Sequence, residues 1–122
     1  MKWRIHIITA VVLGAVLSAP STALGQRAEL VFRVPVTGII ELGLAPFIER
    51  AIREAEAAGA RAIVLDIDTP GGRVDAAERI ADAIADSQVP VYAFVNRRAF
   101  SAGALISLAT QGIYMRSGSV IG

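Results

Sequence analysis

Two short apolar runs, separated by a helical stretch, constrain the fold of this chain most strongly. The runs at 62–67 (AIVLDI) and 91–95 (VYAFV) are rich in β-branched and aromatic residues, and Gly59, Pro70 and Pro90 bound them. Neither run alternates between apolar and polar residues, which predicts strands buried on both faces, as in a parallel sheet. Parallel neighbours need a crossover connection, so the residues between the runs should form a helix.

Helical periodicity appears where that crossover requires it. Apolar residues recur at helical spacing over 44–55 and 74–84, with charged residues on the opposite faces. Strand-forming residues also occur at 29–40, with a bend in that stretch, and at 113–115, while 101–109 is predicted to be a very apolar helix. Strands alternating with helices predict an α/β fold with a mostly parallel sheet.

The segment that enters the last helix carries two further predictions. Residues 96–100 are expected to form a loop, and Leu105, Ile106 and Leu108 are expected to pack into the core. The pair at 97–98, two arginines, could contact a substrate or a phospholipid surface, but the pattern favours a solvated loop pair.

The first residues have the three-part layout of a secretory signal peptide. A short cationic start, an apolar run over 5–17 and small residues ahead of Gln26 predict cleavage near Gly25. The chain then divides into a signal peptide at 1–25 and a domain at 26–122. A retained membrane anchor is the alternative. It is the less favoured one, because the apolar run is shorter than the roughly 20 residues that a membrane span needs.

The composition of the remaining domain excludes several classes of function. Without Lys2 and Arg4, the 12 basic residues fall to ten against 11 acidic ones, and no basic cluster exceeds Arg97–Arg98, so nucleic acid is not an expected partner. With no cysteine, the core must rely on apolar packing. Such a short domain has a marginal core unless it assembles or continues in a longer chain, and we expect a homo-oligomer.

A serine and a glycine turn follow the two buried runs and are expected to meet. The turn at 69–72 (TPGG) follows the first run, and Ser101 follows the second, so both should lie at the carboxyl ends of neighbouring parallel strands, where α/β sheets bind ligands. The small residues after Ser101 leave its hydroxyl uncovered, and the amide of Ala102, at the start of the helix, is available to a developing negative charge. Gly71 and Gly72 both suit a second amide that must approach closely.

Less specific interpretations of these residues stay open on sequence grounds. A serine at a helix start is commonly an N-cap, and a Pro-Gly-Gly sequence is commonly only a turn. Asp66 and Asp68 are expected to be strand-end or turn-capping residues, because a carboxylate with an ordinary pKa is a poor base toward a serine hydroxyl.

Taken together, these motifs resemble those of the Clp-type serine peptidases. The match rests on 66–72 (DIDTPGG), 91–95 and 101–104 (SAGA), and it extends over roughly 30–122. The chain is most similar to the NfeD membrane-bound serine proteases and more distantly to signal peptide peptidase A. The resemblance implies a ClpP/crotonase-like fold of stacked β-β-α units, incomplete at the C-terminus.

The same resemblance implies roles for five residues. Ser101 would be the catalytic nucleophile, and the amides of Gly72 and Ala102 would form the oxyanion hole, with Pro70 and Gly71 shaping the turn. It also implies an exported serine endopeptidase at the periplasmic face of the inner membrane, without a metal or other cofactor. Its substrates would be peptides, notably hydrophobic segments of membrane proteins, with a stomatin-like membrane protein as a partner.

Two features depart from that family's pattern. Phe100 stands before the nucleophile in place of a small or aliphatic residue, where it would narrow the substrate pocket or pack beneath the loop. The base is the more serious departure, because Lys2 and His6 are the only lysine and histidine and both belong to the predicted signal peptide. A lysine downstream of Gly122 is therefore expected to act as the general base, and residues 26–122 should be inactive alone.

Two other functions fit the same residues. A crotonase-like acyl-thioester binder would use the two amides to polarise a thioester carbonyl without a base. A scaffold domain that binds a membrane partner would not need the hydroxyl of Ser101 at all.

Overall fold

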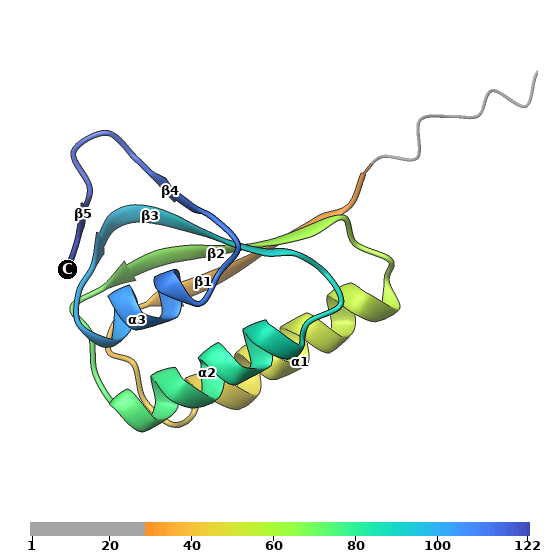
Figure 1. Cartoon of the computed structure of the whole chain (residues 1–122), viewed down its shortest axis with the longest axis horizontal. Helices are drawn as coiled ribbons and strands as arrows, with labels where there is room; N and C mark the ends of the chain where they lie inside the picture. Colours follow the sequence, from red (N-terminus) through yellow and green to blue (C-terminus); the bar gives the residue numbers. More distant parts are fainter. Residues whose placement is uncertain (1–28) are drawn as a thin grey trace, which may run out of the picture.

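The computed structural model describes residues 29–122, which form a parallel β-sheet with three helices on one side (Figure 1). The signal-peptide prediction for 1–25 lies outside these residues. The elements are, in order, β1 (Val31–Thr37), α1 (Leu44–Ala57), β2 (Ala62–Thr69), α2 (Val74–Asp86), β3 (Val91–Ala99), α3 (Ala102–Leu108), β4 (Ile113–Met115) and β5 (Val120–Ile121).

Every strand pair in the sheet is parallel, which confirms the predicted α/β fold. The strands lie in the order β1-β2-β3-β4, and β5 also pairs with β3. Strand β4 pairs with β3 at 93–95, whereas β5 pairs further along at 98–99. Each helical crossover therefore places consecutive strands side by side, as a parallel sheet requires.

The core lies between the sheet and the helices. Alternate residues of the central strands point at the helices and are fully buried, among them Ile63, Leu65 and Ile67 of β2. Helices α1 and α2 meet them with apolar faces that include Ile48 and Ile80, which are also fully buried. The amphipathic periodicity read from the sequence is thus the pattern that this core uses.

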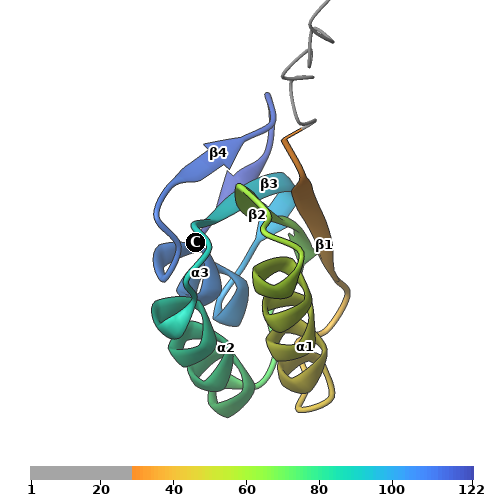
Figure 2. The same cartoon turned by 90° about the vertical axis from the view of Figure 1, so that its right-hand side faces the viewer.

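The other face of the sheet is open in the described residues, so the prediction of strands buried on both faces is wrong. Val64, Tyr92 and Phe94 point away from the helices and are only partly buried, and Tyr114 joins them around an apolar hollow of about 390 Å³. The reason is visible in Figure 2, where all three helices lie beneath one face of the sheet. An uninterrupted apolar run could not reveal this asymmetry, because partly buried aromatic residues satisfy the same pattern.

The first strand stretch ends in the predicted bend. Strand β1 stops at Thr37, Gly38 has a positive φ of 82°, and Ile40 then forms a separate parallel bridge with Gly72. This bridge carries the chain past the glycine turn before α1 begins.

The prediction of a loop at 96–100 is wrong for residues 96–99, because β3 continues to Ala99. Partners on both edges hold this extension: Ala99 aligns with Thr69 of β2 and with Ile121 of β5. Strand β5 itself was not predicted, since two residues carry no periodicity. Pairing with neighbours has overridden the weak strand propensity of Asn96 and the two arginines.

The packing prediction for the last helix holds for one residue of three. Ile106 is fully buried, whereas Leu105 is 41% and Leu108 is 73% exposed. Helix α3 turns Ala102, Gly103, Ile106 and Ser107 inward, so the two leucines fall on its outer side. Within residues 29–122, every helix is too short or too polar to cross a membrane.

Candidate active site

The glycine turn and Ser101 lie against each other at the carboxyl ends of β2 and β3. The amide of Phe100 donates to the carbonyl oxygen of Thr69 (3.2 Å), which joins the ends of the two strands. A Cβ atom added to Gly71 would lie 2.9 Å from Cβ of Ser101 and 3.5 Å from its Oγ. Only glycine fits at that position, and the meeting of turn and serine expected from the sequence is what the fold produces.

Ser101 has an unusual backbone conformation. Its φ is 52° and its ψ is −115°, and among the described residues no other non-glycine has a positive φ. Such a conformation costs on the order of 1–3 kcal/mol, and strain of this kind clusters at functional sites. Two hydrogen bonds hold the turn: the amide of Ser101 donates to the oxygen of Gly122 (2.8 Å), and that of Gly103 to the oxygen of Phe100 (2.9 Å).

The hydroxyl of Ser101 is not used as a helix cap. Ser101 occupies the N-cap position of α3, yet its side chain makes no capping hydrogen bond, and the residue is exposed. The N-cap interpretation is therefore wrong, and the hydroxyl is left available for chemistry.

Two amides beside Ser101 have no acceptor within residues 29–122, and they are those of Gly72 and Ala102. On either side of Gly72, the amide of Gly71 donates to Oγ1 of Thr69 (3.0 Å) and that of Arg73 to the oxygen of Ile40 (2.8 Å). The neighbours of Ala102 are bonded as described above. The turn and the start of α3 thus each contain one backbone amide that donates no hydrogen bond within residues 29–122. Free amides of this kind can stabilise an oxyanion if they face it.

Thr69 is a site residue that sequence reasoning missed. It is fully buried, and its Oγ1 both donates to the oxygen of Gly38 (2.5 Å) and accepts from the amide of Gly71 (3.0 Å). Its methyl group lies against Gly103, where an added Cβ would overlap Cγ2 of Thr69. One side chain therefore positions both the glycine turn and the helix that follows Ser101.

Ile40 fixes the turn from its other side. Its amide donates to the oxygen of Gly71 (2.9 Å), and its own oxygen accepts from Arg73. A Cβ on Gly72, whose φ is 157°, would overlap the backbone of Ile40. The requirement for glycine at this position is therefore steric, because Ile40 leaves no space for a side chain.

The aspartates near the turn both lie within β2. Asp68 precedes the last residue of the strand, so it is a strand-end residue as predicted, whereas Asp66 lies further inside. Asp66 is buried and accepts hydrogen bonds from Arg33 and from Nδ2 of Asn96 (3.2 Å). Asp68 forms ion pairs with Arg98 (3.4 Å) and Arg97 (3.9 Å). These arginines are exposed as predicted, but they are strand residues with a carboxylate partner and not a loop pair. Both carboxylates are engaged with arginines.

Asp75, in the first turn of α2, is also unsuited to act as a base. Hydrogen bonds from the guanidinium of Arg73 (2.9 and 2.7 Å), together with the amide of Ala76, lower the pKa of Asp75 from 3.8 to about 2. The two residues that could have served as a conventional base, Lys2 and His6, lie outside the described residues.

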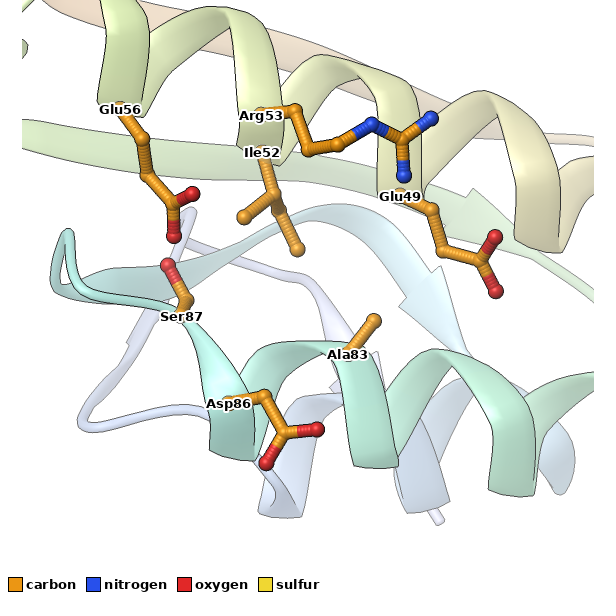
Figure 3. A pocket seen from close by; sticks show the side chains of 7 residues that line it. All are labelled: Glu49, Ile52, Arg53, Glu56, Ala83, Asp86 and Ser87. Carbon is orange, nitrogen blue, oxygen red and sulfur yellow. The ribbon is translucent and has the colours of Figure 1, made fainter.

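A second hollow lies between α1 and α2, and Figure 3 shows its lining. It measures about 180 Å³, and its residues are Glu49, Ile52, Arg53, Glu56, Ala83, Asp86 and Ser87. The one hydroxyl among them, that of Ser87, donates to the oxygen of Val89 (2.7 Å) and is thereby occupied. Helix α2 ends here and leads into the start of β3, so this hollow lies toward the amino-terminal ends of the strands, whereas Ser101 lies at their carboxyl ends.

Comparisons with known proteins identify relatives of known name and structure. Membrane protein NfeD1b of Bacillus subtilis (strain 168) is 45% identical over 108 residues, which cover 87% of this chain and 25% of that protein. The 1510-N membrane-bound stomatin-specific protease of Pyrococcus horikoshii has been solved as a lysine-to-alanine mutant in complex with a substrate peptide. It superposes with a TM-score of 0.74 at 36% identity, over 77% of this chain and 44% of the solved one.

A more distant structure has the same fold. A ClpP1 variant from Listeria monocytogenes superposes with a TM-score of 0.61 at 28% identity, over 64% of this chain and 46% of that chain. The expected ClpP-like fold is therefore confirmed. The chain spans about a quarter of the Bacillus relative and less than half of either solved chain.

A family model that matches nearly all the described residues shows to which family this chain belongs. A family model described as "NfeD1b, N-terminal domain" matches residues 30–122, which include the glycine turn, Ser101 and all eight elements of the fold. The resemblance noted from the sequence motifs is confirmed, and the chain belongs to the NfeD1b N-terminal domain family.

Proposed function

We propose that this chain is the first part of an exported serine endopeptidase domain of the Ser-Lys type. In the proposed reaction, Oγ of Ser101 attacks a peptide carbonyl, and the amides of Gly72 and Ala102 stabilise the oxyanion that forms. A lysine beyond Gly122 takes the proton from the hydroxyl and later returns it to the leaving amine. The observation that carries this proposal is an exposed, uncapped serine packed against a glycine turn, with one free amide in the turn and another at the residue after the serine.

The relatives support the peptidase class. The Pyrococcus protein is named as a membrane-bound protease specific for a stomatin homologue, and one of its solved forms is a lysine-to-alanine mutant holding a substrate peptide. By this analogy the substrates are peptide segments of a stomatin-like or other membrane protein. The partly exposed ring of Phe100, directly before Ser101, supports an apolar residue near the scissile bond.

The proposal also covers location and assembly. A cleaved signal peptide at 1–25 would export the domain to the periplasmic face of the inner membrane, where membrane-protein substrates are within reach. Assembly into a homo-oligomer would cover apolar surface such as the outer side of α3, where Leu105 and Leu108 are exposed.

The test compares two proteins in a peptide-cleavage assay: residues 26–122 alone, and the full-length protein, which here means the chain together with the proposed lysine-bearing part beyond Gly122. The full-length protein should cleave, and Ser101→Ala should lower kcat/KM by at least about a thousandfold, because no other nucleophile replaces the hydroxyl. Ser87→Ala, which removes the occupied hydroxyl in the α1–α2 groove, is the control and should leave cleavage unchanged. Residues 26–122 should not cleave; turnover by this piece that disappears in Ser101→Ala would show that the base lies inside it.

A second function uses the same free amides without a base. A crotonase-like binder would hold an acyl-thioester carbonyl on Gly72 and Ala102, which fits the absence of lysine and histidine from 26–122. Tight binding of an acyl-CoA by a full-length protein that cleaves no peptide would favour it. If the chain is instead a scaffold domain that binds a membrane partner, Ser101→Ala should change the result of no functional assay.

A further inference from the structure

A cationic groove lies next to Ser101, between the second half of β3 and the turn that joins β4 to β5. It measures about 460 Å³, and its lining residues are Asn96, Arg97, Arg98, Phe100, Arg116, Ser117, Gly118 and Val120. Three of the eight are arginines and none is acidic. Neither the proposed nucleophile nor the oxyanion donors explain this concentration of guanidinium groups.

The positive charge of the groove is only partly compensated. Asp68 is the carboxylate paired with the groove, and it is shared by Arg97 and Arg98 at 3.9 and 3.4 Å. The third guanidinium, that of Arg116, donates to the neutral Oδ1 of Asn96 (3.1 Å). The side chains of Arg97 and Arg98 are 75% and 47% exposed, so both retain donors that face solvent.

The groove is connected to the candidate nucleophile by one short strand. Strand β5 begins at Val120 in the groove wall, and two residues later the oxygen of Gly122 accepts the amide hydrogen of Ser101. An extended chain advances about 3.3 Å per residue, so the groove wall and the serine are separated by roughly two residues of peptide. On the other wall, Phe100 directly precedes Ser101.

From this placement we propose that the groove is a substrate subsite that binds an acidic side chain, aspartate or glutamate, two or three residues from the scissile bond. Guanidinium groups bind carboxylates with paired, charge-assisted hydrogen bonds, while Phe100 and Val120 offer apolar contact to the methylene groups of such a side chain. This subsite rests on the proposed peptidase function. A peptide is the favoured occupant because the groove is concave and continuous with the serine turn.

The test measures binding separately from cleavage. Full-length protein carrying Ser101→Ala is titrated, by fluorescence anisotropy, into two labelled peptides that are identical except for glutamate or glutamine at the candidate position. The glutamate peptide should bind about tenfold more tightly at low salt, and the preference should shrink as ionic strength rises. Arg98→Gln and Arg116→Gln should each reduce the preference by about three- to fivefold.

The control removes the same charge elsewhere. Arg61 directly precedes β2, so it lies at the amino-terminal ends of the strands, whereas Ser101 lies at their carboxyl ends. Its guanidinium pairs with Glu29. Arg61→Gln should leave the glutamate preference unchanged. All variants should retain the thermal midpoint of the parent, because the substituted side chains lie at the surface, and Arg97→Gln provides a further groove variant if one of the others fails to fold.

Each outcome separates the subsite from the peptidase proposal. Equal binding of the two peptides, or equal loss of preference in Arg61→Gln, overturns the subsite even if the full-length protein cleaves peptides. An arginine-dependent preference in a protein that cleaves nothing supports the groove and rejects the peptidase. If instead phosphatidylglycerol vesicles bind in an arginine-dependent manner and neither peptide is preferred, the groove serves a lipid surface and the proposal is wrong.

Discussion

Ser101 holds a conformation that is the mirror image of ordinary extended backbone, which glycine adopts without strain and other residues do not. We therefore expect Ser101→Gly to be more stable than Ser101→Ala by about 1 kcal/mol, although both remove the hydroxyl. Relief of backbone strain exceeds the extra entropy that glycine gives the unfolded chain. Urea denaturation of the two variants measures this difference, and equal stabilities would mean that the turn relaxes around alanine.

At the same scale, Asp75 gives the fold a defined pH dependence. Its pKa is lowered from 3.8 to about 2, chiefly by the hydrogen bonds from Arg73, so folding favours the charged form. The contribution of this carboxylate to the free energy of unfolding is complete above about pH 4 and is lost as the pH falls toward about 2.

Asp75→Asn should therefore be less stable than the parent at pH 6, and it should lose less stability between pH 4 and pH 2. Denaturation curves at several pH values provide the measurement. Parallel losses of stability in both proteins would show that other acidic groups, such as Glu49 with its lowered pKa, account for the acid dependence.

The residues of the candidate site differ in how far the sequence could predict them. Ser101, Gly71 and Gly72 could be singled out because a serine and a double glycine that follow consecutive parallel strands must come together at the ligand-binding edge of the sheet. Thr69 could not, since a threonine before a proline is ordinary at a strand end. Its importance comes from Gly38, which lies 31 residues away and accepts its hydroxyl hydrogen.

At the scale of elements, the contact between α3 and β2 has almost no spare room. Gly103→Ala should lower the free energy of unfolding by about 1–3 kcal/mol, because the new methyl group would overlap Cγ2 of Thr69. Gly43→Ala is the matched control: a Cβ there meets nothing within 4 Å, so its effect should stay within about 0.5 kcal/mol.

Removing the opposing methyl group should restore the packing. Thr69→Ser keeps the hydroxyl that bonds Gly38 and Gly71 but deletes Cγ2, and the next atom that a Cβ on Gly103 would meet is Cβ of Ala99 at 3.7 Å. The double variant should recover most of the stability lost in Gly103→Ala, with a coupling energy of about 1 kcal/mol or more in a double-mutant cycle. Additive effects would show that α3 shifts instead.

Elements with a long periodic pattern were predictable, and those made by pairing alone were not. Helices α1 and α2 carry several turns of amphipathic sequence, and β2 is a dense apolar run. By contrast, the end of β3 contains Asn96 and two arginines, and it is extended because β2 and β5 pair with it. Local propensity cannot show such partners, which come from distant parts of the chain.

For the whole molecule, β5 joins the sheet to the candidate site. A chain ending at Ser119 would lose the pairing of Val120 and Ile121 with β3, as well as both hydrogen bonds of Gly122. We expect the amide of Ser101 to exchange with solvent at least about a hundredfold faster in this variant. Amides of Leu65 and Ile67 in the middle of β2 should change much less.

Hydrogen exchange followed by NMR measures both sets of amides in one experiment. Unchanged protection of Ser101 would mean that the glycine turn, through Thr69 and Gly71, holds the serine without β5. Loss of protection throughout β2 would mean that β5 stabilises the entire sheet.

The place of β5 in the sequence also has a consequence for biosynthesis. Strands β1, β2 and β3 pair in the order in which the ribosome makes them, so most of the sheet can form as the chain emerges. Ser101, however, is made before the residue whose oxygen receives its amide hydrogen, with α3 and β4 in between. The serine turn is thus completed only after α3, β4 and β5 have been made, so a nascent chain that ends before β5 would not hold Ser101 in its final backbone geometry.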